Sequence, residues 1–250
     1  MPHADRLPRP ETLVKKEPTM ARILFVMTGA DHWTLDDGTQ HPTGFWAEEF
    51  LSPYRIFVDA GHEVEVATPG GVVPTVDRAS LAADANGGQD NADALERAVE
   101  QNAVLGAPVR LEDIDPSVYS AVFYPGGHGP MEDLADNADS ARVLTFAVDS
   151  ETPLGVLCHA PAALLAARRD DGSHVFSGYR LTSFTNEEEK QAGLADKASW
   201  LLQDRLEGMG ADFTAGAPWQ PHVVHDRTLF TGQNPASSTA LAAEVSRALT

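Results

Sequence analysis

A cysteine and a histidine stand side by side in the stretch GVLCHAPAAL, and Cys158 is the only cysteine among the 250 residues. A thiolate is a strong nucleophile, and a neighbouring imidazole can accept its proton or orient it. Core filling is the alternative, because free cysteine is among the most buried residue types. The position favours chemistry, since residues 155–157 have the pattern of a strand and Pro161 fits the first turn of a helix. We predict that Cys158 is a nucleophile at a strand-to-helix turn, with His159 beside it.

A catalytic histidine needs a carboxylate on its other ring nitrogen, and the stretch FTNEEE offers Glu187, Glu188 and Glu189 in succession. Such a run is also typical of a solvated helix start, where acidic side chains suit the positive end of the helix dipole. The spacing alone does not choose among the three glutamates.

A second acidic pair, Glu48 and Glu49, begins an amphipathic stretch over residues 46–60. At helical spacing Glu49 shares a side with Phe45, about 100° from Glu48. A glutamate that faced the sheet would stay protonated and could donate a hydrogen bond to a thiolate. The residues by themselves slightly favour an exposed acidic first turn instead.

The stretch YPGGHGPMEDL places Gly126, Gly127, His128 and Gly129 directly after a predicted strand. Glycines let the backbone approach a ligand and point N–H groups at it, as an oxyanion hole requires. The pattern is common after parallel strands for steric reasons alone. It lacks the Lys-Ser/Thr of a phosphate-binding loop and the full glycine spacing of a dinucleotide site.

Charge and composition exclude several classes of function. The formal net charge of -19 makes binding to a phosphate backbone unfavourable, so we expect no nucleic-acid partner. One cysteine excludes an intramolecular disulfide, and no stretch has the pattern of a signal peptide or of a bilayer-spanning helix. We expect a soluble cytoplasmic protein. The nine histidines are scattered without the spacing of a metal motif, so we expect no metal and no cofactor.

Strand and helix patterns alternate along most of the chain. Apolar runs that read as strands occupy residues 21–30, 63–68, 120–124 and 153–157, and two short strands are expected within 222–232. Amphipathic stretches occupy residues 46–60, 134–150, 160–169, 93–104, 200–209 and 237–249. This alternation predicts an α/β fold with a doubly wound, mostly parallel sheet sandwiched by helices.

Ligands of such sheets collect beyond the carboxyl ends of the strands, which here are the loops 28–44, 126–131 and 158–161. Residues 1–20 are rich in proline and charge and read as a flexible arm ahead of a single domain over 21–250. Residues 81–109 read as a small surface excursion without visible chemistry.

With these motifs assembled, residues 23–249 resemble the superfamily of intracellular protease I and the parkinsonism-associated deglycase, whose fold is flavodoxin-like and class I glutamine amidotransferase-like. More narrowly they resemble its heat-shock chaperone and glutathione-independent glyoxalase III branch. The resemblance rests on TGFWAEEFLSPYRIFVDAGHEVEVATPGG, PGGHG, GVLCHAPAAL, FTNEEE and LFTGQNPASS.

The resemblance implies roles for the candidate residues. Cys158 corresponds to the nucleophile, His159 to its triad histidine and Glu189, ahead of Glu188 and Glu187, to the acid. Glu49 rather than Glu48 matches the glutamate that hydrogen-bonds the nucleophile. The oxyanion donors correspond to the amides of Gly127 and His159, with Gly126 and His128 in the same substrate-binding turn.

Two positions depart from the family pattern. Ala160 replaces a frequent glycine, which we expect to narrow the mouth of the pocket. Some bacterial chaperone members carry a metal site with two histidines and one glutamate, but Val58 stands where its first-helix histidine is expected. The resemblance therefore implies no such metal site.

The function implied is conversion of methylglyoxal or another 2-oxoaldehyde to D-lactate or another 2-hydroxy acid through a cysteine hemithioacetal. Deglycation or hydrolysis at the same Cys-His-Glu site is the first alternative, with peptidase action ranked lowest. A stress-response holdase that takes unfolded client proteins, or a thiol oxidation sensor, is the alternative from another class. Glutamine amidotransferase action is the least favoured. We expect a dicarbonyl substrate, no membrane partner and, from the resemblance alone, a homodimer.

Overall fold

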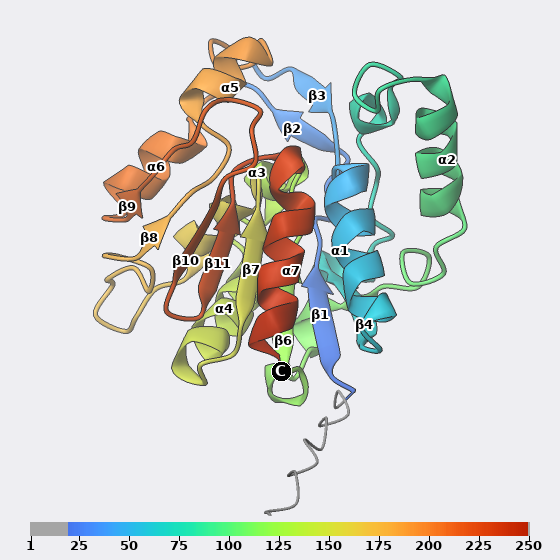
Figure 1. Ribbon diagram of the computed structural model, residues 1–250. Coiled ribbons are helices and arrows are strands. Elements are labelled where there is room, and N and C mark those ends of the chain that lie inside the picture. Colours follow the sequence, from blue (N-terminus) through green and yellow to red (C-terminus); the bar gives the residue numbers. More distant parts are fainter. Residues whose placement is uncertain (1–19, 250) are drawn as a thin grey trace, which may run out of the picture.

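The structure is a computed structural model that describes residues 20–249. Its centre is a seven-stranded sheet in the order β10-β11-β7-β6-β1-β4-β5 (Figure 1). Neighbouring strands run parallel, except that the edge strand β10 is antiparallel to β11. The doubly wound, mostly parallel α/β fold expected from the sequence is confirmed.

The strands of the main sheet are β1 (Arg22–Val26), β4 (Glu63–Thr68), β5 (Val109–Arg110), β6 (Ala121–Tyr124), β7 (Leu154–Leu157), β10 (Val223–Asp226) and β11 (Leu229–Gly232). Two separate pairs are the antiparallel β2 (His32–Thr34) with β3 (Gln40–Pro42), and the parallel β8 (Arg180–Leu181) with β9 (Asp212–Phe213).

The α-helices of the described residues are α1 (Ala47–Asp59), α2 (Gln89–Glu100), α3 (Gly129–Asp133), α4 (Ala138–Asp149), α5 (Asn186–Gln191), α6 (Leu202–Gly208) and α7 (Ser238–Ala248). Short 3₁₀ helices are η1 (Pro69–Gly71), η2 (Arg78–Leu81), η3 (Leu111–Asp113), η4 (Pro116–Val118), η5 (Ala160–Ala166) and η6 (Pro235–Ser237). None of the helices in the described residues is long and apolar enough to cross a membrane.

The central strands are buried on both faces, which is why they read as continuous apolar runs rather than alternating ones. Helices α1 and α7 lie side by side over one face of the sheet (Figure 1). Helices α3 and α4 and the 3₁₀ helix η5 cover the other face and contribute to its hydrophobic cluster. Burial of both faces gives the sheet the two apolar layers that make it a rigid platform for the loops at its edge.

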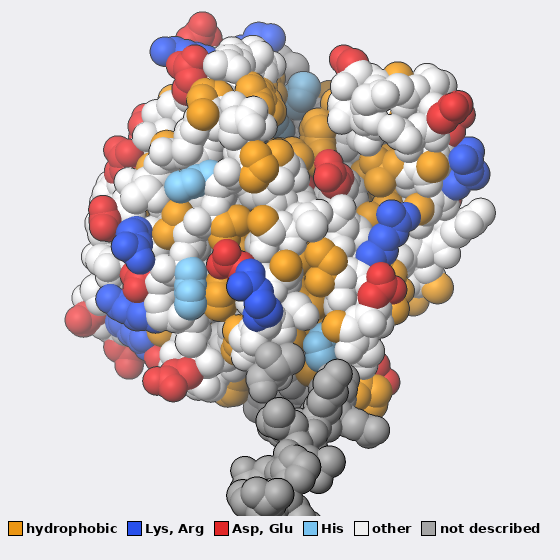
Figure 2. Space-filling model, viewed as in Figure 1, with side chains coloured by type: hydrophobic (Ala, Val, Ile, Leu, Met, Phe, Trp, Pro, Cys, Tyr) orange, Lys and Arg blue, Asp and Glu red, His pale blue; other side chains and the backbone are white. Residues whose placement is uncertain are grey.

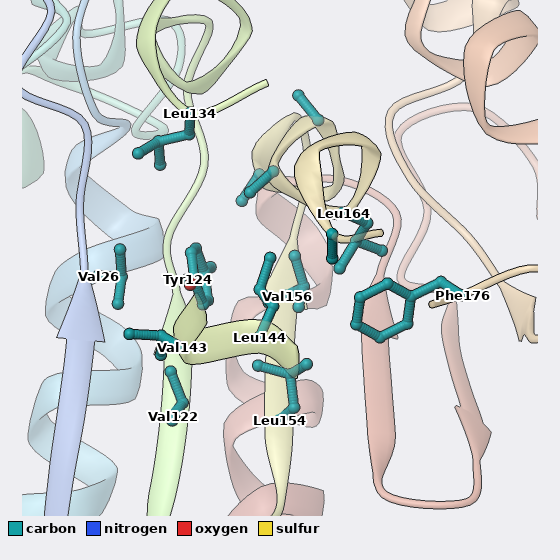
Figure 3. Close-up of a cluster of buried hydrophobic side chains, with 14 of the residues drawn as sticks. Val26, Val122, Tyr124, Leu134, Val143, Leu144, Leu154, Val156, Leu164 and Phe176 are labelled. Atoms are coloured by element: carbon teal, nitrogen blue, oxygen red, sulfur yellow. The ribbon is translucent and has the colours of Figure 1, made fainter. Parts of the chain in front are cut away.

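Figure 3 shows the hydrophobic cluster on the α4 face of the sheet. Val26, Val122 and Val156 come from three adjacent parallel strands and are at most 1% exposed. Val143 and Leu144 of α4 pack on them and are fully buried. Burying one such side chain contributes about 1.5–3 kcal/mol, so the strands that carry the site are strongly held.

The structure corrects two expected helices. The helix expected over 134–150 starts only at Ala138, because Asn137 caps it: the Asn137 side chain accepts the N–H groups of Asp139 and Ser140. The stretch 160–169 is not an α-helix but the seven-residue 3₁₀ helix η5, which ends at Ala166. We therefore assign no role to a helix dipole at Cys158.

The excursion expected over 81–109 contains more regular structure than the composition indicated. Helix α2 begins at Gln89, directly after Gly88, and Val109 enters the sheet by pairing with Ala67 of β4. Of the arm expected over residues 1–20, only Met20 belongs to the described residues, and it is exposed. The division into an arm and one domain stays a prediction.

Candidate active site

Cys158 occupies a sharp turn at the carboxyl end of β7. Its φ of 59° lies in the left-handed region, which non-glycine residues rarely adopt. Its N–H donates to the carbonyl of Gly232 at 2.9 Å, and its carbonyl accepts the N–H of Phe184 at 2.9 Å. The two backbone hydrogen bonds hold the turn, and only 3% of the residue is exposed.

The thiol, an imidazole and a carboxylate form a chain. Sγ of Cys158 lies 3.3 Å from Nδ1 of His159. Nε2 of His159 lies 2.7 Å from Oε2 of Glu189. All three residues are buried, so water does not compete for these contacts. The arrangement can pass a proton from sulfur to imidazole while the carboxylate balances the charge.

Of the three consecutive glutamates, Glu189 is the one that contacts His159, because helix α5 turns each side chain in a different direction. Glu187 points to the surface and accepts a hydrogen bond from Gln191. Glu188 reaches back to the N-terminus of α5, where it forms a capping box with Thr185. The interpretation of the run as a merely solvated helix start is wrong for Glu188 and Glu189, which are both buried.

His128 joins this chain from the glycine-rich turn. Its Nε2 lies 2.9 Å from Oε1 of Glu189, so each carboxyl oxygen of Glu189 faces a different imidazole. The His128 ring stacks on the indole of Trp33 at 5.1 Å, and its centroid lies 4.0 Å from that of His159. Stacking on Trp33 therefore holds the plane of the His128 ring.

The protonation states of His159 and Glu189 follow from these contacts. Burial, together with the proximity of His128, lowers the pKa of His159 to about 4, so the ring is neutral at pH 7. Burial opposes the ionisation of Glu189, but the two imidazoles outweigh it and lower its pKa. An ionised Glu189 accepts one hydrogen bond from the Nε2–H of each imidazole. The neutral His159 ring then carries its lone pair on Nδ1, where it faces the thiol.

Glu49 lies on the far side of Cys158, on helix α1. Its Oε2 accepts the N–H of Gly126 at 2.8 Å, and its Oε1 is buried without an oxygen or nitrogen partner. The residue is 0% exposed, whereas its neighbour Glu48 is partly exposed. The residues by themselves favoured an exposed acidic first turn, and this expectation is wrong at Glu49 because α1 directs its side chain at the sheet.

Glu49 and Cys158 affect each other's ionisation. Burial raises the pKa of Glu49 to about 8, so the carboxyl is protonated at pH 7. Burial and then the charge of Glu49 raise the pKa of the Cys158 thiol, while a hydrogen bond from the Gly127 amide lowers it. A protonated Glu49 removes the repulsive charge and leaves an O–H donor for the developing thiolate.

The glycine-rich turn needs its glycines because other groups approach them closely. A Cβ on Gly126 would lie 2.5 Å from the carbonyl of Leu157 and 2.6 Å from Oε2 of Glu49. A Cβ on Gly127, whose φ is 97°, would lie 2.3 Å from the carbonyl of Gly44. Within the described residues the N–H groups of Gly127 and His159 donate to no backbone carbonyl, and the Gly127 N–H donates to the Cys158 sulfur instead, which suits the pair to an oxyanion formed at that sulfur.

Of these residues, Gly127, His128, Cys158 and His159 line a pocket of about 850 Å³. Aromatic and aliphatic side chains, including Trp46, Val76, Phe184 and Trp219, form its walls, and the β2–β3 side supplies Leu35 and His41. Figure 2 shows histidine and hydrophobic surface in the notch between the α2 side and the α5–β3 side. The three loops expected to be functional, 28–44, 126–131 and 158–161, all contribute to this pocket.

Ala160 does not narrow the pocket as expected from the sequence. It is fully buried in the hydrophobic cluster on the α4 face and does not line the pocket. The reason is the turn itself: the residues after His159 enter η5, which packs back under the sheet edge rather than continuing along the pocket wall.

Several aromatic residues of the site escaped the sequence reasoning: Phe184 and Trp219 line the pocket, and Trp33 stacks on His128 behind it. Phe184 packs against the His159 ring at 4.3 Å and against the Trp219 ring at 5.4 Å. Trp219 has a φ of 60° and donates its N–H to Oε1 of Glu188 at 2.8 Å. The signal available in the sequence was Trp33, which lies within residues 28–44, a segment already expected to be functional.

Val58, which replaces the first-helix histidine of the family metal site, is 41% exposed on α1. The absence of that metal site stays a prediction. Among the described residues, His128, His159 and Glu189 form a different group of possible metal ligands, whose donor atoms all lie within 4.8 Å of one another.

A mostly parallel α/β sheet with a buried Cys-His-Glu chain at the turn after a central strand defines a class of α/β proteins. The model of the DJ-1/PfpI family matches residues 42–248. The chain belongs to the DJ-1/PfpI family.

Three relatives illustrate the neighbourhood of the chain. The protein/nucleic acid deglycase HchA of Staphylococcus aureus is 27% identical over 233 residues, covering 88% of this chain and 77% of the relative. The 24 kDa rapid encystment protein of Francisella tularensis has a TM-score of 0.82 at 26% identity, covering 92% and 100% of the two chains. Glyoxalase III of Candida albicans has a TM-score of 0.79 at 25% identity, covering 92% and 97%.

Proposed function

We propose that the protein converts 2-oxoaldehydes such as methylglyoxal to 2-hydroxy acids such as D-lactate, with Cys158 as the nucleophile. The observation that carries this proposal is the buried chain from Cys158 through His159 to Glu189 at the end of an open pocket. The likeness to glyoxalase III of Candida albicans supports the choice of reaction.

The first step is addition of the thiol to the aldehyde carbon. The bond from sulfur to carbon forms, the C=O π electrons move to oxygen, and the thiol proton passes through Nδ1 of His159 to that oxygen. The amides of Gly127 and His159 stabilise the developing negative charge. Protonated Glu49 donates to the sulfur while it carries charge.

The second step moves a proton between two carbon atoms. His159, neutral again, removes the proton from the former aldehyde carbon and delivers it to the ketone oxygen, so that an enediol forms. His159 then takes the hydroxyl proton of the former aldehyde carbon and delivers it to the neighbouring carbon, which gives a 2-hydroxy thioester of Cys158. Water then hydrolyses the thioester, which frees the thiol and the 2-hydroxy acid. The sum of these steps is one dicarbonyl plus one water giving one 2-hydroxy acid.

The direct experiment incubates the wild type and Cys158→Ala with methylglyoxal in the absence of glutathione. Loss of dicarbonyl and the chirality of the lactate formed are followed together. We expect D-lactate from the wild type and none from the variant. Full conversion by Cys158→Ala would exclude the mechanism.

Deglycation at the same site is the second candidate, and the likeness to the deglycase of Staphylococcus aureus favours it. The same thiol and oxyanion donors would attack an early adduct of glyoxal on an amine or thiol. Parallel assays with free methylglyoxal and with a washed, pre-glycated peptide separate the candidates. Release of the free peptide faster than methylglyoxal is consumed would favour the deglycase.

A further inference from the structure

Glu189 is shared between two imidazoles in a way that the proposed reaction does not require. Its Oε2 contacts Nε2 of His159 at 2.7 Å and its Oε1 contacts Nε2 of His128 at 2.9 Å. The side chain of His159 is 2% exposed, that of His128 is 11% exposed and that of Glu189 is 5% exposed. Two imidazole nitrogens and a carboxylate therefore converge on one small volume.

This donor set matches the ligands of Zn²⁺, which takes imidazole nitrogen and carboxylate oxygen in tetrahedral sites. The donor atoms lie within 4.8 Å of one another. Tetrahedral Zn²⁺ with bonds of about 2.0–2.1 Å holds its ligand atoms about 3.4 Å apart, so side-chain rotations that close about 1.4 Å at most suffice.

The rings are already oriented without a metal. Trp33 stacks on His128 at 5.1 Å, and the Phe184 ring packs against the His159 ring at 4.3 Å. His128 and His159 both line the pocket, which provides an entry path and room for a fourth ligand from solvent or substrate. A site with three protein ligands and one open position is the pattern of accessible rather than purely structural zinc.

We propose that His128, His159 and Glu189 bind Zn²⁺, and that the bound metal switches off the thiol chemistry of Cys158. Coordination takes the lone pair of Nε2 on each ring, so the single ring proton of neutral His159 moves from Nε2 to Nδ1. That N–H faces the sulfur at the position where the free base accepted a proton. The metal-bound ring can donate to Cys158 but no longer accept from it.

Cys158 itself is outside this ligand set, because its sulfur lies on the Nδ1 side of His159 and the metal lies on the Nε2 side. This separates the proposal from ligation by the thiol. The inhibition rests on the proposed function, whereas the binding does not.

The test is titration calorimetry of the EDTA-treated full chain with ZnCl₂. We expect one Zn²⁺ per chain for the wild type and for Cys158→Ala. His128→Asn and Glu189→Gln should bind at least about 100-fold more weakly, since loss of even an outer partner of a metal ligand costs 10–100-fold. The matched control is His41→Asn, which removes another pocket histidine whose ring lies 6.3 Å from His128 but outside the ligand group, and it should bind like the wild type.

X-ray absorption of the wild-type zinc complex needs no variant and guards against misfolding of the substituted chains. We expect only nitrogen and oxygen neighbours at about 2.0–2.2 Å, and a sulfur shell near about 2.3 Å would overturn the proposal. Absence of binding at millimolar ZnCl₂, or binding that survives in both His128→Asn and Glu189→Gln, would also overturn it.

Turnover of methylglyoxal with and without Zn²⁺ tests the switch. We expect one equivalent of bound metal to abolish conversion and EDTA to restore it. A chain that binds Zn²⁺ as described but never converts methylglyoxal would remove the proposed function and leave the metal site standing. Undiminished turnover by the fully loaded protein would refute the switch.

Discussion

Sγ of Cys158 lies 3.3 Å from the Nδ1 atom of His159, the residue that follows it in the chain. Neighbouring side chains at a turn need not face each other, and here they do because of the left-handed φ of Cys158. The same turn directs Nε2 of His159 at Glu189, so one strained residue aligns both contacts of the imidazole.

Replacement of Glu189 tests the carboxylate of this chain. Glu189→Gln removes the charge that stabilises protonated His159, and we expect kcat/KM for methylglyoxal to fall about 10²–10⁴-fold. The matched control is Glu187→Gln on the exposed side of the same helix, which should keep wild-type kinetics. Equal losses in the two variants would show that the effect belongs to helix α5 rather than to the contact with His159.

Glu188 should matter for stability rather than for chemistry. Its carboxylate accepts four hydrogen bonds, from the N–H and hydroxyl of Thr185, the N–H of Trp219 and the amide of Asn234. Glu188→Gln places an NH₂ group against these donors, and we expect the free energy of unfolding to fall by about 2–3 kcal/mol. Urea unfolding at constant pH measures the change. An unchanged midpoint and slope would contradict this reading of the network.

Because of Glu49 we expect kcat/KM for methylglyoxal to fall at alkaline pH. With a pKa of about 8, its carboxyl is a donor below that pH and an unprotonated anion beside the sulfur above it. We therefore expect kcat/KM of the wild type to decrease as pH rises through about 8, because kcat/KM reports groups of the free enzyme. Glu49→Gln keeps a neutral donor and should lack this decrease. The same alkaline limb in both proteins would assign it to another group.

The same pKa has a consequence for stability. The folded chain holds the Glu49 proton up to about pH 8, whereas the unfolded chain releases it near the ordinary value of 4.5. Between these pH values the folded state binds more protons at Glu49 than the unfolded state does. The free energy of unfolding therefore decreases as pH rises from about 4.5 to about 8. Urea unfolding at pH 5 and pH 8 should show a smaller difference for Glu49→Gln than for the wild type.

Gly126 should not tolerate a side chain. Gly126→Ala would place a methyl group 2.6 Å from Oε2 of Glu49 and 2.8 Å from Cβ of Cys158, so either the turn or the carboxyl must move. We expect loss of activity and a destabilised fold. Gly208→Ala is the control, since a Cβ there meets nothing within 4 Å and alanine favours the helix. Thermal unfolding and methylglyoxal turnover of the two variants provide the comparison.

The sheet was predictable because its strands are buried on both faces. The apolar run at residues 120–124 contains β6, which is buried along its whole length, and the strands β10 and β11 both fall within the expected residues 222–232. The turn between them lies at Arg227 and Thr228. Short strands were not predictable in the same way. The β2–β3 pair carries polar and partly exposed residues, and it owes its position to the pocket wall rather than to an apolar period.

Helix boundaries depended on local hydrogen bonds that periodicity does not report. The amphipathic pattern runs through residues 134–150, yet the helix begins only at Ala138, where the Asn137 side chain accepts two N–H groups. Apolar residues after Cys158 follow a helical period, but the chain tightens there into a 3₁₀ helix. In both places the pattern identified the buried face and not the backbone path.

The amino-acid sequence by itself determined the α/β class, the elbow at Cys158 and the set of acids from which its partners come, because apolar period and turn residues are local properties. Tertiary structure decided that Glu189 rather than Glu187 or Glu188 meets His159, and that His128 shares the same carboxylate. Consecutive helical residues point about 100° apart, so the choice depends on how α5 lies against the turn of Cys158. That position is set by packing between segments distant in the chain, which spacing within the sequence does not encode.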